Sequence, residues 1–253
     1  MSARVRLDRL LVDRGLAPNR ERAQRLVMAG AVLVGDRPMT KAGTMVAADV
    51  ELRLRESASP YVSRAGEKLA GALDAFAIDV AGRVALDVGA STGGFTDCLL
   101  RRGAARVIAV DVGYGQLAWS LRQDARVTVI DRTNARTLEA SHLPEPPEVA
   151  TIDVSFISLT LILPAVANLV VPGGTIIPMV KPQFEVGRDH VGKGGVVRDP
   201  THRAMAVQRV RESATTLGLI VIADSESVLP GPKGNREVFL HLVRPNPANS
   251  GPA

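Results

Sequence analysis

From residue 63 onward, apolar and polar positions switch between the period of a strand and that of a helix. Short apolar runs predict strands at 83–88, 106–112, 126–131, 149–154, 174–180, near 219–224 and at 236–243. Amphipathic segments predict helices at 63–76, 93–103 and 201–218. This alternation predicts an α/β fold with a Rossmann-like, doubly wound and mostly parallel sheet, whose ligands bind at the carboxyl ends of the strands.

The most apolar run, at 159–171, contains Pro164 and Asn168. It is shorter than the roughly 20 residues that a helix needs to cross a bilayer. We therefore expect a core helix there and no membrane span.

The first 55 residues follow a different pattern, typical of a small α+β module. Leu7, Leu10 and Leu11 would share one helix face, and Asn19 is a good N-cap for a second helix. The Gly-Asp pair at 35–36 lies between short apolar segments, as in a hairpin. We predict one domain at 1–55, a linker at 56–62, a larger domain at 63–245 and a disordered tail at 246–253.

Composition adds the compartment and the distribution of charge. The single cysteine, Cys98, excludes an intrachain disulfide and a cysteine metal cluster, which suits a reducing cytoplasm. The N-terminus lacks the apolar run of a secretory signal, and the four histidines show no metal-ligand spacing, so no metal is expected. Of the formal net charge of +5, residues 1–60 hold +4. That asymmetry fits an anion-binding module on a nearly neutral domain, or simply a solvated surface.

Basic side chains of the N-terminal module are the first candidates for a nucleic-acid contact, because guanidinium groups on a rigid helix suit phosphates. The run from Arg6 to Gly43 resembles the S4 RNA-binding domain, with Asn19 in a position where that family usually has Ser. The glycine-rich loop at 183–199 is a second candidate, as a lid over RNA or as an ordinary flexible loop. The predicted RNA-binding residues are Arg4, Arg6, Arg20, Arg22, Arg25, Lys41, Arg64, Arg188 and Lys193.

A glycine-rich turn at 87–94 follows the first predicted strand of the larger domain. It lacks the lysine of a phosphate-binding P-loop and the spacing of the dinucleotide fingerprint. It fits the acidic-x-Gly-x-Gly-x-Gly motif of methyltransferases, with Ser91 in the middle position. Asp111 and Asp131 end the next two strands, where acids can bind ribose hydroxyls and an adenine amino group. An acid at the second strand also serves NAD, so the loop spacing and Asp131 favour S-adenosylmethionine. The predicted cofactor residues are Asp87, Gly89, Ala90, Ser91, Gly93, Asp111 and Asp131.

Four polar residues remain near the predicted strand ends, and they indicate the methyl acceptor. The fourth strand lacks the Asp/Asn-Pro-Pro-aromatic clamp of amino-group methyltransferases, and Cys98 lies on the wrong element for cytosine carbon-5 chemistry. Lys68, Asp153, Lys181 and Glu237 stand in the chain order of the tetrad in FtsJ-like ribose 2′-O-methyltransferases. In this arrangement Lys181 would either deprotonate the ribose hydroxyl or orient it as an ammonium donor, and the sequence leaves both roles open.

Across almost its full length the chain resembles the TlyA-type rRNA 2′-O-methyltransferases, a family historically called hemolysins. The resemblance rests on the S4-like module and the segments YVSRAGEKL, LDVGASTGGFTDCLL, VDVGYGQL, DVSFISL, MVKPQFE and KGNREVF. It implies methylation of a cytidine ribose in 23S and in some members 16S rRNA, within ribosomal subunits. We expect the protein to be a monomer. Two alternatives stay open: an RNA-binding assembly protein without catalysis, and a membrane-lytic hemolysin.

Overall fold

The computed structural model describes residues 4–28, 30–54, 59–231 and 233–246. It divides into two compact units, residues 1–60 and 61–253. Residues 56–58 of the predicted linker and 247–253 of the predicted tail lie outside the described residues. Each unit has a hydrophobic core of its own.

The N-terminal unit packs two helices on short antiparallel strands. Its helices are α1 (Leu7–Asp13) and α2 (Arg20–Met28), and its strands are β1 (Arg4–Arg6), β2 (Val32–Val34), β3 (Arg37–Met39), β4 (Met45–Ala47) and β5 (Leu52–Leu54). The apolar face predicted for the first helix is confirmed, because Leu7 and Leu11 are fully buried. Asn19 caps α2 by accepting the amide of Arg22 at 2.8 Å, and β2 and β3 form the predicted hairpin.

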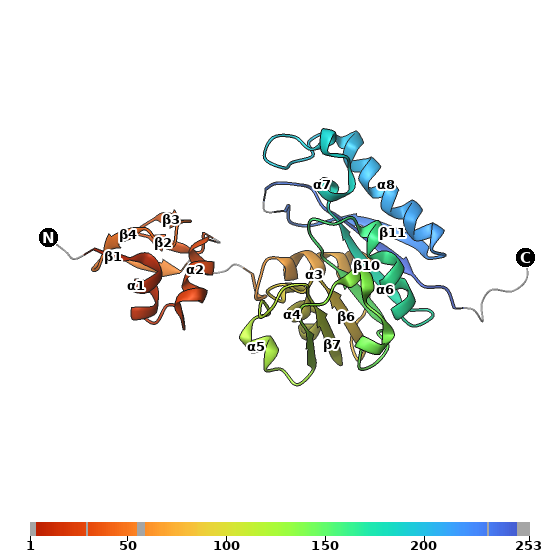
Figure 1. Ribbon diagram of the computed structural model, residues 1–253, viewed down its shortest axis with the longest axis horizontal. Coiled ribbons are helices and arrows are strands. Elements are labelled where there is room, and N and C mark those ends of the chain that lie inside the picture. The colour runs from red at the N-terminus through yellow and green to blue at the C-terminus, as the bar shows by residue number, and fades with distance from the viewer. Residues whose placement is uncertain (1–3, 29, 55–58, 232, 247–253) are drawn as a thin grey trace, which may run out of the picture. The chain divides into compact units, whose positions relative to one another are not determined.

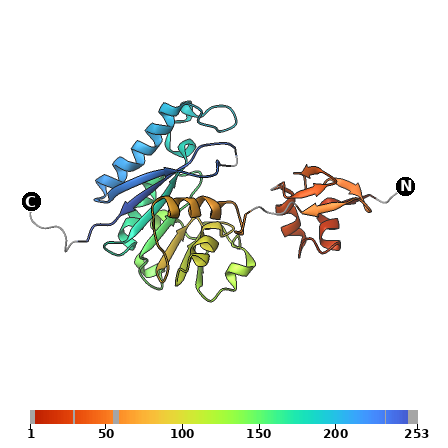
Figure 2. The same ribbon diagram turned by 180° about the vertical axis from the view of Figure 1, so that it is seen from behind.

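The larger unit is built on a seven-stranded sheet, which confirms the α/β prediction (Figures 1 and 2). Its strand order is β11-β12-β10-β9-β6-β7-β8. β12 is antiparallel to both of its neighbours, and the pairs β10–β9, β9–β6, β6–β7 and β7–β8 are parallel. The strands are β6 (Val84–Val88), β7 (Arg106–Val110), β8 (Val127–Ile130), β9 (Val149–Ile152), β10 (Thr175–Val180), β11 (Ile220–Glu226) and β12 (Val238–Val243).

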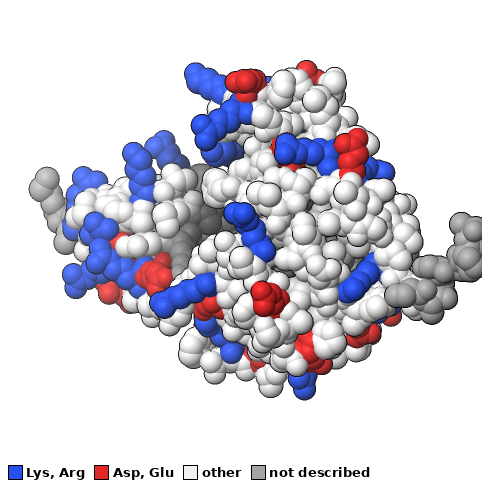
Figure 3. Space-filling model, turned by 45° about the vertical axis from the view of Figure 1, so that its right-hand side comes forward, with Lys and Arg blue, Asp and Glu red and all other residues white. Residues whose placement is uncertain are grey.

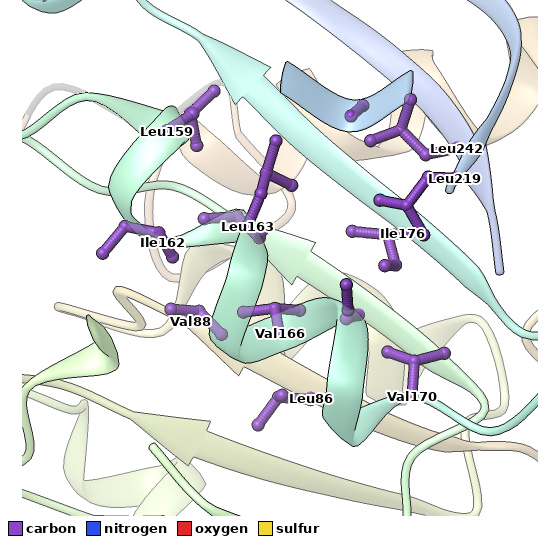
Figure 4. Packing of buried hydrophobic residues seen from close by; sticks show 14 of the residues in the cluster. Leu86, Val88, Leu159, Ile162, Leu163, Val166, Val170, Ile176, Leu219 and Leu242 are labelled. Atoms are coloured by element: carbon purple, nitrogen blue, oxygen red, sulfur yellow. The ribbon is translucent and has the colours of Figure 1, made fainter. Parts of the chain in front are cut away.

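Helices cover both faces of this sheet. On one face α3 (Ala65–Ala75) and α4 (Gly94–Arg101) enclose a core with alternate strand residues such as Ala85 and Val107. On the other, α6 (Leu163–Leu169) and α8 (Pro200–Thr216) pack on Leu86, Val88 and Ile176, as Figure 4 shows. Shorter helical segments are α5 (Trp119–Arg122), α7 (Pro182–Glu185), η1 (Ala135–Thr137), η2 (Ala140–His142), η3 (Leu159–Leu161) and η4 (Arg188–His190).

The core helix expected at 159–171 is divided into two parts. A 3-10 turn, η3, precedes α6, and Pro164 lies in the first turn of α6. Proline has no amide hydrogen to donate, so it is tolerated where a helix begins and breaks one that continues through it. The sequence identified the apolar segment and its burial, and the proline explains the position of the break.

Candidate active site

The turn between β6 and α4 is held in a conformation that only small residues allow. Gly89 and Gly93 have φ angles of +85° and +97°, in the left-handed region that favours glycine. A Cβ atom on Gly89 would lie 2.5 Å from the carbonyl oxygen of Asp153, and one on Gly94 would overlap Ser63 Oγ. The turn therefore lies directly against the end of β9 and the residues that precede α3.

Ser91 occupies the middle of this turn and is also left-handed, with φ of +48°. Its amide donates to Asp111 Oδ2 at 2.8 Å, and the amide of Gly113 donates to Asp111 Oδ1 at 2.7 Å. The predicted ribose-binding acid at the end of β7 is thus fixed to the glycine turn itself. Each carboxylate oxygen keeps a second lone pair, so Asp111 can still accept hydrogen bonds from ligand hydroxyls.

A cavity of about 160 Å³ opens beside the turn. Its lining includes Gly89, Ala90 and Ser91 of the turn and the polar residues Asp153, Ser155 and Lys181. The remaining lining residues are Ser63, Ala65, Thr92, Gly94 and Phe95. The glycine turn contributes backbone atoms without bulky side chains to the cavity wall, and Asp153 and Lys181 contribute a carboxylate and an ammonium group. It can therefore accept the charged sulfonium end of a methyl donor next to a polar acceptor.

The four residues of the predicted tetrad form two ion pairs. Lys68 Nζ lies 2.5 Å from Glu237 Oε2, and the two side chains are 8% and 2% exposed. Lys181 Nζ lies 2.5 Å from Asp153 Oδ1 and donates to Ser155 Oγ at 2.9 Å. Because Val180 pairs with Val238 in the antiparallel β10–β12 ladder, Lys181 and Glu237 occupy the next facing positions. The sheet therefore brings the two pairs to one edge.

Asp87 lies beneath the turn and outside the cavity wall. Its side chain is fully buried, and it accepts hydrogen bonds from Thr96 Oγ1 at 2.6 Å and Thr151 Oγ1 at 3.3 Å. The carboxylate is therefore not among the groups that line the cavity, and its hydrogen bonds hold the turn to α4 and β9. Burial raises the pKa of Asp87 to about 7, and the charge of Asp153 acts in the same direction.

This burial predicts a pH-dependent stability. The folded protein binds a proton at Asp87 up to about pH 7, whereas an unfolded aspartate releases it near pH 4, so stability falls as pH rises between these values. Asp87→Asn should then stabilise the cofactor-free protein by about 1–2 kcal/mol at pH 8 and by much less at pH 5. Chemical denaturation at both pH values measures this. Equal effects at the two pH values would contradict it, and Asp97→Asn, on the neighbouring helix, is the control.

Asp131, the predicted adenine partner, is engaged by another residue. Arg122 at the end of α5 donates to Asp131 Oδ2 from both terminal nitrogens, at 2.7 and 3.1 Å, and the amide of Gly115 donates to the same oxygen at 3.2 Å. An adenine amino group would have to share this carboxylate with Arg122. The sequence indicated Asp131 as the adenine partner, but it gave no sign that Arg122 would bind the same carboxylate.

Two of the predicted RNA-binding arginines in the N-terminal unit are held by a buried acid. Asp8 is fully buried and accepts from Arg6 at 2.9 and 3.0 Å, from Arg20 at 3.0 Å and from Gln24 at 2.9 Å. These donors, Arg6 first, hold the pKa of Asp8 well below its ordinary value. The side chains of Arg6 and Arg20 remain about half exposed, so the buried Asp8 holds both guanidinium groups at the surface of the unit.

The other basic candidates are exposed. Arg4 donates to the carbonyl oxygen of Met45 at 2.8 Å, and Arg22, Lys41, Arg64, Arg188 and Lys193 are exposed to solvent. The side chain of Arg25 lies outside the described residues. On the face seen in Figure 3, Lys and Arg side chains gather over the N-terminal unit. The loop with Arg188 and Lys193 is tied to the segment before β12, because the buried Asn235 bonds Val197 N at 2.9 Å and Gly195 O at 2.8 Å.

Two residues of the loop after β9 were not singled out by the sequence analysis. Ser155 lines the cavity and is bonded to Lys181. Phe156 is 91% exposed, has a φ angle of +65° and lies with its ring centroid 5.2 Å from that of Phe184. The signals that mark Phe156 are its exposed aromatic ring and its left-handed backbone conformation. Both can be read only from a structure.

Within the part of the chain that the structure describes, no helix is long and apolar enough to span a membrane. No group of three or more His, Cys, Asp or Glu side chains there could hold a metal ion.

A seven-stranded sheet with one antiparallel strand, a glycine turn over a small polar cavity and two lysine–acid pairs at the strand ends together describe a methyltransferase of the Rossmann-like class. Comparison with known families agrees. Residues 61–244 match the FtsJ-like methyltransferase family and residues 5–52 match the S4 domain. The chain belongs to the FtsJ-like methyltransferase family, and its methyl donor is S-adenosylmethionine.

Similar proteins extend over nearly the whole chain. It is 51% identical to the 16S/23S rRNA (cytidine-2′-O)-methyltransferase TlyA of Mycobacterium tuberculosis, over 96% of this chain and 91% of that protein. It is 48% identical to the putative rRNA methyltransferase YqxC of Bacillus subtilis, over 99% and 89%. The solved structure of a putative hemolysin from Streptococcus thermophilus is 40% identical in sequence. It covers 99% of this chain and 93% of its own, and it superposes with a TM-score of 0.76.

Proposed function

We propose that this protein transfers a methyl group from S-adenosylmethionine to the ribose 2′-hydroxyl of a cytidine in rRNA, within ribosomal subunits. The observation that carries the proposal is the pair of lysine–acid contacts, Lys181–Asp153 and Lys68–Glu237, at the strand ends beside the glycine turn. The printed activity of the Mycobacterium tuberculosis relative supports the choice of cytidine and of rRNA. All four side chains come from one chain, so a monomer suffices, and the place of action is the cytoplasm, where ribosomes are found.

The reaction needs an oxygen nucleophile made from a weakly acidic hydroxyl. When bound, S-adenosylmethionine supplies an electrophilic methyl group on a positively charged sulfur. The ribose oxygen forms its new bond to this carbon as the carbon–sulfur bond breaks, and the hydroxyl proton leaves. Lys181 lines the cavity and is the side chain that reaches this oxygen, either accepting its proton or holding it in line by a hydrogen bond.

The other residues of the proposed site have supporting roles. Asp153 holds the Lys181 side chain at 2.5 Å, and the buried Lys68–Glu237 pair places two compensating charges behind it. Gly89, Ala90, Ser91 and Gly93 would form the floor under the methionine end of the donor, with Asp111 on the ribose and Asp131 toward the adenine. The oriented Arg6 and Arg20 would contact RNA phosphates.

A methyl-transfer assay tests the proposal. Purified protein is incubated with S-adenosylmethionine tritiated on its methyl group and with ribosomal subunits from a strain that lacks the enzyme. Label should enter rRNA, and mass spectrometry of nuclease digests should find it on a cytidine ribose. Label on a base, or none on either subunit, would refute the proposal. The latter result would favour an RNA-binding protein without catalysis, whereas leakage of liposomes would favour a lytic protein.

Phe156 gives a prediction for RNA recognition. Its exposed ring, next to the Lys181 partner Ser155, is suited to stack on an unpaired base. Stacking of one base on an aromatic side chain is worth about 1–3 kcal/mol. Phe156→Ala should therefore raise the KM for ribosomal subunits by about 5- to 150-fold and leave S-adenosylmethionine affinity, measured by calorimetry, within about twofold. Phe156→Tyr keeps the ring and is the control; an unchanged KM in Phe156→Ala would exclude stacking.

A further inference from the structure

The loop that joins β9 to η3 carries Ser155 and is fixed at both ends. At its start, the amide of Asp153 donates to the carbonyl oxygen of Val88 at 2.9 Å. At its end, the buried carboxylate of Glu185 accepts from Ser158 Oγ at 2.5 Å and from the amide of Leu159 at 2.8 Å. Between these anchors Phe156 is held in the left-handed region, which costs about 1–2 kcal/mol for a residue other than glycine. A loop that retains such strain between two anchors presents Ser155 in a defined position.

Ser155 contacts the ammonium group that faces the cavity. Lys181 Nζ donates to Ser155 Oγ at 2.9 Å, while Asp153 Oδ1 lies 2.5 Å from the same nitrogen. An ammonium has three N–H groups and rotates about its terminal bond unless its partners fix it. The hydroxyl of Ser155 accepts a hydrogen bond from one of these N–H groups, whereas Asp153 Oδ1 forms an ion pair with Nζ without accepting a hydrogen bond. Ser155 therefore fixes the rotation of the ammonium and leaves its other N–H groups for an oxygen in the cavity.

We propose that Ser155 is a positioning residue for Lys181, which sets the orientation of the Nζ group and stabilises its protonated form. The inference rests on the proposed function of Lys181. The charged groups around Lys181 are Asp153 at the end of β9, Glu237 opposite it at the start of β12, Lys68 of α3 in contact with Glu237, and Asp87 of β6, which interacts with Asp153. None of these charges is altered when Ser155 is replaced, so the effect of its hydroxyl can be measured separately.

Ser155→Ala tests the proposal through two pH profiles. Loss of the acceptor removes a hydrogen bond to the ammonium, so the pH midpoint of Lys181 reactivity should fall by about one unit. Competitive acylation followed by peptide mass spectrometry measures this midpoint in the protein without RNA or cofactor, with the exposed Lys193 as internal reference. In the methyl-transfer assay, the limb of the pH–rate profile that depends on Lys181 should move to lower pH. The kcat should fall about 10-fold with little change in KM. A rising limb identifies Lys181 as a base, and a falling limb identifies it as an ammonium donor.

Two further variants separate positioning from a general disturbance of the loop. Ser155→Thr keeps the hydroxyl and should restore the wild-type midpoint. Ser158→Ala removes a hydroxyl of the same loop that binds Glu185 and not Lys181. The amide of Leu159 still anchors the loop to Glu185, so the midpoint of this variant should equal that of the wild type. The proposal is overturned if Ser155→Ala leaves the acylation midpoint of Lys181 unchanged, or if Ser158→Ala moves it equally. If instead the wild-type protein methylates no RNA, the proposed function fails while the acylation result still decides the role of Ser155.

Discussion

Lys181→Ala is expected to reduce kcat for methyl transfer to rRNA by about 10²–10⁴-fold, the range that a positioned acid–base group contributes. Lys181 is the ammonium or amine that lines the cavity, and alanine leaves no side chain there to act on the hydroxyl proton. The KM for ribosomal subunits should change much less, because the phosphate contacts proposed here lie elsewhere. Initial rates with tritiated S-adenosylmethionine over a range of subunit concentrations separate the two constants.

Lys193→Ala is the matched control for this variant, since Lys193 is an exposed lysine outside the cavity. It should leave kcat near the wild-type value and weaken subunit binding in a salt-dependent way. Calorimetry should show that the Lys181→Ala variant still binds S-adenosylmethionine, which would mean that the cavity of the variant is intact. If the Lys181→Ala variant retained more than about a tenth of the wild-type kcat, Lys181 would not have the proposed catalytic role.

The second large effect concerns the buried Lys68–Glu237 pair. Lys68→Met leaves the Glu237 carboxylate buried at 2% exposure without its partner, and breaking a buried pair in this way costs about 3–5 kcal/mol of unfolding free energy. The variant is therefore expected to unfold at clearly lower denaturant concentration than the wild type. Urea denaturation followed by circular dichroism measures the difference, with the midpoint compared at equal slope.

The double variant, Lys68→Met with Glu237→Gln, removes both charges. It should recover most of the lost stability, since no unpaired charge then remains buried, but it should not recover methyl transfer if the pair serves the reaction. Recovery of both stability and activity would mean that the pair acts only in folding. A double variant as unstable as Lys68→Met would show that the two side chains do not compensate each other.

Much of the architecture could be predicted from periodicity. The strands around Leu86, Ile108 and Ile152 are short apolar runs that are buried on both faces, and such runs are the clearest local signal of a parallel sheet. The glycine turn was recognisable because its spacing reflects a backbone requirement, which the positive φ angles of Gly89 and Gly93 display. The helices predicted at 63–76, 93–103 and 201–218 agree with α3, α4 and α8 to within two residues at each end. The short helices α5 and α7 were not predicted, and Pro164 divides the core helix expected at 159–171.

The contacts within the candidate site could not be predicted in the same way. Chain order indicated which four polar residues to consider, but not that Lys68 would contact Glu237 and Lys181 would contact Asp153, because no local pattern encodes such pairings. The partner of Asp131, Arg122, lies on a short helix without a strong periodic signal. Ser155 and Phe156 are single residues in a loop, and their importance comes from exposure, backbone conformation and one hydrogen bond.

The position of β12 has a consequence for the way the protein is made. Lys68 and Glu237 are separated by 169 positions, and β12 is inserted between β10 and the earlier strand β11. Synthesis runs from the N-terminus, so β11 is made before β12. In a nascent chain that ends after β11, Lys68 lacks its partner Glu237, and the strand that should pair with β10 on the side away from β9 is missing. Newly made molecules should thus gain competence only after β12 has been synthesised and has joined the sheet.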